Sequence, residues 1–339
     1  MKKVILYIFI IVISAFLIPI LFTMQFDFAN TNVANAEDLK LDPESQETPD
    51  IGEYNYKEYG TIKLLHAKTG EIEELPIDQY LYGVVSAEMP ANFEIEALKA
   101  QAIVARTYTV YKIKNNGGKH QNADICDSSS CCQAWITKED RLNRWDEDVR
   151  EEYWGKIVNA VDSTKGKIIT YENEPINAFF HSNSGGSTEI PLNVWGGSGY
   201  PYLQVVSTSG EDAYTQYNSE LELTEDEVIA KIKAVHSEFE IDFSKEDAIQ
   251  IIEYTESGRI KTIKFGNVNL SGVEARTIFG LRSAKFSIQK IEDKIKFTVI
   301  GYGHGVGMSQ TGADALAKQG SSFEDIIKHF YVGVEIVDI

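Results

Sequence analysis

A single acidic residue, Glu88, follows an apolar run in the stretch "VVSAEMP". The stretch predicts that Glu88 ends a helix, because Pro90 pushes Met89 out of the α-helical region. The unpaired carbonyls at a helix C-terminus and the apolar neighbours disfavour a charged carboxylate, so both raise its pKa. A carboxyl group that stays protonated near neutral pH can act as a general acid. The alternative is a solvated glutamate at a helix end, with no catalytic role.

A second group of reactive side chains lies in "HQNADICDSSSCC", which holds His120 and all three cysteines of the chain, Cys126, Cys131 and Cys132. One imidazole and three thiolates would complete a tetrahedral zinc shell, and such a closed shell is structural because it leaves no position for water. The alternative is a disulfide from Cys126 to one of the adjacent cysteines, with one thiol left free. The spacing is not standard for zinc, so the residues alone leave both alternatives open.

Histidines and small polar residues accompany glycines in two further segments, "HSNSGGST" (181–188) and "GYGHGVGMSQ" (301–310). Glycines allow a close approach between backbone and ligand. The second segment lacks the lysine and the strand-turn-helix order of a phosphate-binding loop. Taken alone, each segment favours a tight structural turn over a ligand site.

The elements that must position these groups follow from periodicity and turn residues. Two strands around Thr69-Gly70 precede a helix in 77–88, and a second helix from Glu94 to Lys114 carries one apolar face. These two helices form the corner that holds Glu88. Further predicted elements are a helix in 149–164, a hairpin turning at 173–175, a helix capped by Thr224, strands on both sides of Ser257-Gly258, two strands in 286–302, and helices in 313–320 and 322–331. The pattern predicts an α+β fold, a mixed β-rich body with several packed helices.

The N-terminus predicts membrane attachment. An apolar run from Val4 to Phe22 is long enough to span a bilayer, and Lys2 and Lys3 would remain on the cytoplasmic side. We therefore expect a transmembrane anchor at 1–25, an acidic flexible tether at 26–59, and a folded domain at 60–339 outside the cytoplasm. The alternative is a signal peptide cleaved after Ala36, which would also export the domain.

The charge balance excludes one class of partner. The chain has 32 basic and 51 acidic side chains, and its formal net charge is -19. Such an acidic chain is unsuited to phosphate backbones, so nucleic acid is not an expected partner. The 17 tyrosines and 16 phenylalanines suit either a core or a groove in which sugar rings lie on aromatic faces.

Four segments in order give a specific resemblance: "VVSAEMPANFEIEALKAQAIVARTY", "CDSSSCCQAW", "AFFHSNSGGSTE" and "GYGHGVGMSQTGADALAKQG". From residue 60 onward the sequence resembles the stage II sporulation protein D family. The resemblance implies a lytic transglycosylase that cuts the MurNAc-GlcNAc β-1,4 bond of peptidoglycan during engulfment in endospore formation. It also implies that strands already stripped of stem peptides are preferred, and that Glu88, in the SAE-P motif, is catalytic.

The implied reaction explains why the motifs offer only one carboxylate. Most glycosidases use two, one as acid and one as base or nucleophile. A lytic transglycosylase uses the 6-hydroxyl of the muramic acid itself, so one residue can serve as acid and then as base, and 1,6-anhydroMurNAc results. The alternatives are a muramidase that hydrolyses the same bond and a non-catalytic glycan-binding scaffold. A zinc amidase is disfavoured because a closed ligand set offers no site for catalytic water.

The resemblance also implies a cofactor, groove residues and partners. It places zinc on the residues matching His120, Cys126 and Cys132, whereas the family often has histidine at the position of Cys131. The expected partners are glycan strands, a sporulation amidase and a sporulation membrane scaffold protein, with the domain of a single-pass mother-cell membrane protein facing the forespore. The residues expected to line the glycan groove are His181, Ser182, Ser184, Tyr302, His304 and Gln310.

Overall fold

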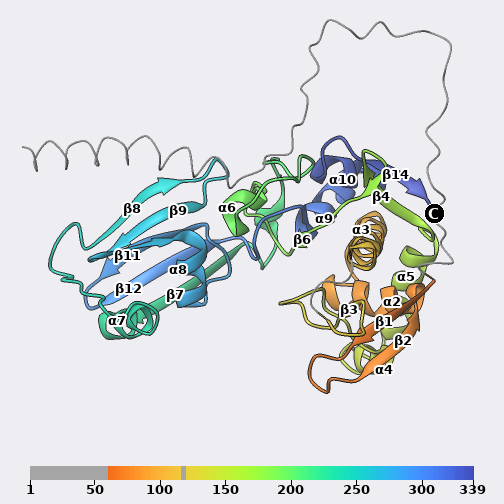
Figure 1. The fold of residues 1–339 in the computed structure, drawn as a ribbon, viewed down its shortest axis with the longest axis horizontal. Coiled ribbons are helices and arrows are strands. Elements are labelled where there is room, and N and C mark those ends of the chain that lie inside the picture. Colours follow the sequence, from red (N-terminus) through yellow and green to blue (C-terminus); the bar gives the residue numbers. More distant parts are fainter. Residues whose placement is uncertain (1–59, 116–119) are drawn as a thin grey trace, which may run out of the picture. The chain divides into compact units, whose positions relative to one another are not determined.

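The computed structural model describes residues 60–115 and 120–339, which form a mixed α+β fold with several sheets (Figure 1). The predicted anchor and tether lie outside the described residues. Within the described part, no helix is both long enough and apolar enough to cross a membrane. Within the described residues, two hydrophobic cores stabilise the fold, one around a central helix and one built from two small sheets and two helices.

The central helix of the first core is α3 (Ile95–Lys114), which is buried on nearly every side from Ala97 to Val110. It contacts α2 (Ile77–Glu88), α5 (Arg150–Asp162), β4 (Lys167–Tyr171), α9 (Gln310–Lys318) and α10 (Phe323–Phe330). The sequence predicted one buried, apolar face for this helix, whereas the helix is buried on nearly all sides. The helix is enclosed because segments from the far end of the chain cover the side that α2 leaves open.

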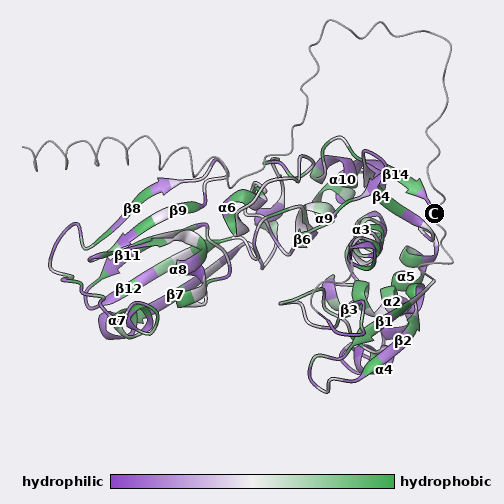
Figure 2. Cartoon of the chain, viewed as in Figure 1, coloured by the Kyte–Doolittle hydropathy of each residue, from purple (hydrophilic) through white to green (hydrophobic). Residues whose placement is uncertain are grey.

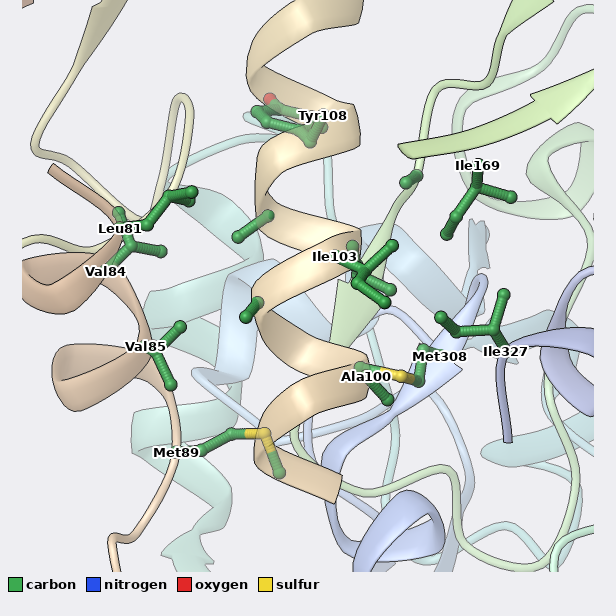
Figure 3. Packing of buried hydrophobic residues seen from close by; sticks show 14 of the residues in the cluster. Leu81, Val84, Val85, Met89, Ala100, Ile103, Tyr108, Ile169, Met308 and Ile327 are labelled. Atoms are coloured by element: carbon green, nitrogen blue, oxygen red, sulfur yellow. The ribbon is translucent and has the colours of Figure 1, made fainter. Parts of the chain in front are cut away.

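Figure 3 shows this packing directly. Helix α3 lies between Val85 of α2 on one side and Ile169 and Ile327 on the other, and Ile103 is on the side of the latter two. The alanines of α3, such as Ala100, leave room for these neighbours to approach. The helix that follows the Glu88 corner is thus fixed from all sides, which makes the corner a rigid position for a functional group.

Short sheets surround this core. Strand β1 (Thr61–Leu65) pairs antiparallel with β2 (Ile72–Pro76) and parallel with β3 (Ile125–Cys126). Strand β4 pairs with β14 (Glu335–Asp338) and with β5 (Glu174–Pro175). The predicted hairpin is present, but it turns at 172–173 and not at 173–175, and its second strand ends at Pro175. Strand β6 (Phe180–His181) pairs parallel with β13 (Met308–Ser309), which places the two glycine-containing segments side by side.

The second core is formed by two three-stranded sheets and the helices α7 and α8. One has the order β11-β12-β7, and the other β10-β9-β8. Apolar and polar residues alternate along β12, as expected of a strand with one buried face (Figure 2). The elements are β7 (Asn218–Thr224), α7 (Glu225–Lys233), β8 (Ile249–Tyr254), β9 (Ile260–Phe265), β10 (Val268–Ser271), α8 (Gly272–Phe279), β11 (Phe286–Ile291) and β12 (Lys294–Ile300).

Helix capping defines the ends of several elements. Thr224 and Glu227 form the predicted capping box at the start of α7. Ser271 and Glu274 form another at α8, an element that sequence analysis missed. Ser309 caps α9, which therefore begins three residues earlier than predicted and includes Gln310 in its first turn. In the described part of the chain, short helices also lie in the connections: α4 (Lys138–Leu142), α6 (Pro191–Trp195) and the 3-10 helix η1 (Glu211–Ala213).

A buried arginine fixes α5 against α3. Arg106 donates hydrogen bonds from Nη1 to the carbonyl of Thr164 (2.8 Å) and from Nη2 to that of Val161 (3.3 Å). Val161 lies in the last turn of α5 and Thr164 directly beyond its end, where the helix dipole favours a cation. Arg106 therefore holds in place the helix that carries Tyr153, a residue of the pocket described next.

Candidate functional site

A pocket of about 400 Å³ opens around Glu88. Its volume lies within the usual range for small-molecule sites. The floor is the corner between α2 and α3, and the walls come from α4, α5, the turn after β6 and the start of α9. The lining residues are Ala87, Glu88, Met89, Pro90, Ala91, Asn92, Phe93, Arg141, Trp145, Tyr153, Ser182, Gln216, Gln310 and Thr311.

The hollow continues beyond this pocket. A neighbouring pocket of about 590 Å³ shares Pro90, Asn92, Phe93 and Gln216 with it and extends to Tyr214. The two pockets together form a groove with Glu88 in one of its parts. Such a groove has room for an extended ligand.

Both carboxyl oxygens of Glu88 have a donor nearby. Oε1 accepts a hydrogen bond from the backbone N–H of Ala134 (2.6 Å), and Oε2 lies 3.4 Å from Nε2 of Gln310. Burial raises the pKa of Glu88, and these two hydrogen bonds, which favour the charged form, offset the effect only in part. The raised pKa of Glu88 agrees with the prediction, and burial is its main cause. The group can thus remain protonated above the usual range of a carboxyl.

The loop that supplies the Ala134 N–H is firmly held. Gln133 is buried and donates from Nε2 to the hydroxyls of Tyr80 on α2 (2.8 Å) and Thr109 on α3 (3.0 Å). Gly83 of α2 allows the loop to approach, because a Cβ there would lie 2.2 Å from Nε1 of Trp135. The donor to Glu88 therefore has a fixed position.

The four predicted metal ligands meet immediately before this loop. The ligand atoms of His120, Cys126, Cys131 and Cys132 all lie within 4.8 Å of one another. His120 Nε2 is 3.4 Å from the Cys132 sulfur and 3.6 Å from the Cys131 sulfur, and the two sulfurs are 4.0 Å apart. Tetrahedral zinc, with Zn–N and Zn–S bonds of about 2.0–2.3 Å, separates its ligands by roughly 3.5–3.8 Å. The cluster fits such an ion, and the three cysteines are free rather than joined in a disulfide.

Two of the six predicted groove residues line the pocket with Glu88, namely Ser182 and Gln310. Neighbouring His181 is buried instead, and its Nδ1 donates to the carbonyl of Val306 (3.1 Å). Burial, assisted by the nearby charge of Arg259, lowers the pKa of His181 to about 3. This imidazole is therefore neutral at physiological pH and orders the turn that carries Ser182.

The other three lie elsewhere. The Ser184 hydroxyl is buried and donates to Glu211 (2.6 Å). His304 packs on Trp195, with ring centroids 4.9 Å apart, and lines a separate cavity of about 10 Å³, the size of one water molecule. Tyr302 is 43% exposed with the guanidinium of Arg282 5.1 Å from its ring centroid. A direct role in glycan binding stays a prediction for these residues.

Glu211 is an organising residue that sequence analysis missed. Its carboxylate accepts hydrogen bonds from the N–H of Ser184 (3.0 Å), the N–H of Gly186 (3.0 Å) and the hydroxyls of Ser309 and Thr311. Burial raises its pKa, but these hydrogen bonds outweigh that effect, so the pKa is lowered and the group is ionised. Glu211 thereby joins the turn after β6 to the start of α9. No periodicity or motif marks it in the sequence.

The aromatic wall of the pocket was also missed. Trp145 and Tyr153 contact edge to face with centroids 5.6 Å apart, and the Arg141 guanidinium lies 4.6 Å from the Trp145 ring centroid. An amphipathic pattern predicted the helix that carries Tyr153, but it could not show that this residue faces Glu88. Aromatic faces are typical surfaces for sugar rings.

The raised pKa of Glu88 predicts a pH-dependent effect of Glu88→Gln on stability. Below about pH 4.3, the ordinary glutamate pKa, the carboxyl is protonated in both the folded and the unfolded chain. As pH rises from there to the raised folded pKa, the unfolded chain loses this proton first, so the wild type loses stability. We expect Glu88→Gln to be more stable than the wild type at pH 7.

Thermal unfolding of both proteins from pH 4 to pH 8 checks this expectation. Glu151→Gln, at an exposed position of α5, is the matched control and should show no such trend. Equal unfolding midpoints for the wild type and Glu88→Gln across the range would show that burial does not perturb Glu88.

Known proteins resemble this chain over most of its length. A family model described as "Stage II sporulation protein" matches residues 66–171. Stage II sporulation protein D of Bacillus amyloliquefaciens is 35% identical over 81% of this chain and 78% of its own length, and the protein of that name from Bacillus subtilis (strain 168) gives the same values. The amidase enhancer of Bacillus subtilis (strain 168) is 28% identical over 76% of this chain and 40% of its own length. This chain belongs to the stage II sporulation protein D family.

Proposed function

We propose that this protein is a lytic transglycosylase that cuts the MurNAc-GlcNAc β-1,4 bond of peptidoglycan glycan strands. One observation carries the proposal: among the described residues that line the pocket, Glu88 is the single carboxylate, and burial raises its pKa. A single protonated carboxyl in a groove matches a reaction whose nucleophile belongs to the substrate.

The reaction proceeds in two linked proton transfers. Glu88 donates its proton to the glycosidic oxygen while the bond between that oxygen and C1 of MurNAc breaks. The Glu88 carboxylate then accepts the proton of the MurNAc 6-hydroxyl, whose oxygen bonds to C1, so that 1,6-anhydroMurNAc forms and no water is consumed. The N–H of Ala134 stabilises the carboxylate between the two steps, and Gln310 and Ser182 are polar groups available to orient the sugar.

A muramidase would need a second carboxylate to activate water. Glu211 is close in structure to the pocket wall, since it binds Thr311, but it is 1% exposed and does not line the pocket. Its oxygens already accept hydrogen bonds from several buried donors. This arrangement favours the lytic reaction over hydrolysis.

We further propose a structural zinc ion at His120, Cys126, Cys131 and Cys132. The support is the clustering of four suitable ligand atoms with separations close to those of a tetrahedral shell. Bound there, the ion would fix the chain immediately before Gln133 and Ala134. Its contribution to catalysis would therefore be the positioning of the Ala134 N–H.

We propose the cellular setting from the N-terminal sequence and from the similar proteins. The name of the amidase enhancer relative is consistent with joint action with a cell-wall amidase, which would supply peptide-stripped strands during engulfment. The apolar run at Val4–Phe22 is the proposed anchor in the mother-cell membrane. Mature protein beginning at Glu37 would contradict the anchor and favour a cleaved signal peptide.

Product analysis tests the proposed reaction. Full-length protein in mild detergent is incubated with purified, peptide-free glycan strands, and the masses of the products are measured by mass spectrometry. We expect 1,6-anhydroMurNAc ends, lighter by one water than hydrolysis products. Reducing ends as the main product would favour the muramidase, and binding without cutting by folded, metal-loaded protein would favour the scaffold.

A further inference from the structure

The Glu88 pocket contains one cation whose role the proposed reaction does not explain. Arg141, on α4, is the single basic residue among the described pocket-lining residues. Its guanidinium stacks on Trp145, and its Nε is buried without a hydrogen-bond partner. Among the described residues no carboxylate forms an ion pair with it, although the chain is strongly acidic; the charged neighbour that affects it is another cation, Arg144.

The basic residue in the neighbouring part of the groove, Lys318, differs from Arg141 because it is paired within the protein. There, Lys318 is bound to Asp314 (2.8 Å) and to the hydroxyl of Tyr214 (3.1 Å), so its charge is compensated within the protein. Among the residues that the structure describes, Arg141 has no such partner, and a partly buried guanidinium remains charged at any physiological pH. A planar guanidinium with free donors matches a carboxylate in geometry and charge.

We propose that Arg141 recognises the free lactyl carboxylate of a muramic acid bound beside Glu88, and so selects strands without stem peptides. In intact peptidoglycan this carboxyl is the carbonyl of an amide to the peptide, so it has no negative charge. Hydrolysis of that amide releases a carboxylate on the same sugar whose 6-hydroxyl is the nucleophile. The reaction class that must supply the substrate is thus amide hydrolysis at the lactyl group.

The position of Arg141 supports this assignment. The residue stacks on Trp145, which in turn contacts Tyr153, so the cation is held at an aromatic surface on which a sugar can lie. Stacking fixes the plane of the guanidinium and reduces the conformational entropy that binding would otherwise cost. The pocket thereby presents an acid for the glycosidic oxygen and a cation for the substituent of the same sugar.

The inference rests on the proposed function, but binding can test it without cleavage. The measurement is calorimetric affinity of full-length Glu88→Gln protein in detergent for three tetrasaccharides. The first is the peptide-free tetrasaccharide made of two GlcNAc-MurNAc units. The second is the same tetrasaccharide with its lactyl carboxylates converted to amides, and the third is chitotetraose, which has no lactyl group. We expect the free carboxylate to bind about 10- to 100-fold more tightly than the amide, as for a charge-assisted hydrogen bond.

Adding Arg141→Met should remove that difference, and chitotetraose affinity measured alongside shows how much of the sugar-binding surface itself is retained. Arg141→Lys, which keeps the charge and the aliphatic stem, should retain part of it and reports on the site if the methionine variant unfolds. Arg150→Met, at a cation that pairs with Glu147 outside the pocket, is the matched control and should keep the full preference.

Two results would overturn the inference: equal affinity of the Arg141-containing protein for carboxylate and amide, or an undiminished preference in folded Arg141→Met. Failure of the unmodified protein to cut any strand would instead count against the proposed reaction. The two ideas can therefore fail separately.

Discussion

Replacing Glu88 with glutamine is expected to reduce glycan cleavage by about 10²- to 10⁴-fold, the usual loss when a general acid is removed. The amide has nearly the same shape and can still accept the hydrogen bond from the Ala134 N–H through its oxygen. It cannot donate a proton to the glycosidic oxygen, and it cannot accept one from the 6-hydroxyl. The protein should therefore fold and bind glycan but turn over very slowly.

Initial rates on peptide-free strands measure this effect, with circular dichroism to confirm folding. Glu151→Gln removes a similar charge at an exposed position and should keep wild-type rates. The dependence on pH adds a second criterion: because Glu88 must be protonated at the start, activity should decline as pH rises through its raised pKa. A folded Glu88→Gln protein with near-wild-type rates would exclude Glu88 as the acid.

Loss of the proposed zinc ion is expected to have the second large effect, on both stability and activity. The purified protein should contain about one equivalent of zinc, and Cys132→Ser should abolish its binding. Because metal affinity contributes directly to the stability of the folded state, we expect the unfolding midpoint to fall by roughly 5–10 °C or more. Activity should fall as well, since Cys132 is followed by Gln133 and by Ala134, the donor to Glu88.

Cys131→His is the matched comparison for this prediction. Imidazole can replace a thiolate in a tetrahedral zinc shell, so this variant should keep the metal and most of the stability. Metal-free wild-type protein with a disulfide from Cys126 would contradict the zinc site. Full zinc occupancy in Cys132→Ser would remove Cys132 from the ligand set.

The sequence was most informative where local rules decide the structure. Pro90 correctly marked the end of α2 at Glu88, and Thr224 with Glu227 correctly marked the start of α7. The cysteine cluster was also visible because its ligands lie within one short segment. In each case the interacting residues are close in the chain, so spacing alone carries the information.

The rest of the site depends on contacts between distant parts of the chain. Gln310 reaches Glu88 across 222 positions, and Glu211 joins the turn after β6 to α9 through buried hydrogen bonds that no local pattern encodes. Periodicity likewise showed one apolar face of α3, because the packing of α9 and α10 on its other side follows from tertiary structure. No sequence motif marks Arg141, and its proposed role follows only from its position in the pocket.

Cleavage of peptide-free glycan in water enriched in ¹⁸O most directly tests the claim that one carboxylate serves a nucleophile within the substrate. In a lytic reaction the oxygen bonded to C1 comes from the MurNAc 6-hydroxyl, so the newly formed ends should be unlabelled 1,6-anhydroMurNAc. In hydrolysis that oxygen comes from the solvent. New reducing ends that each carry one ¹⁸O as the main product would contradict the account, whereas unlabelled anhydro ends are the result that it predicts.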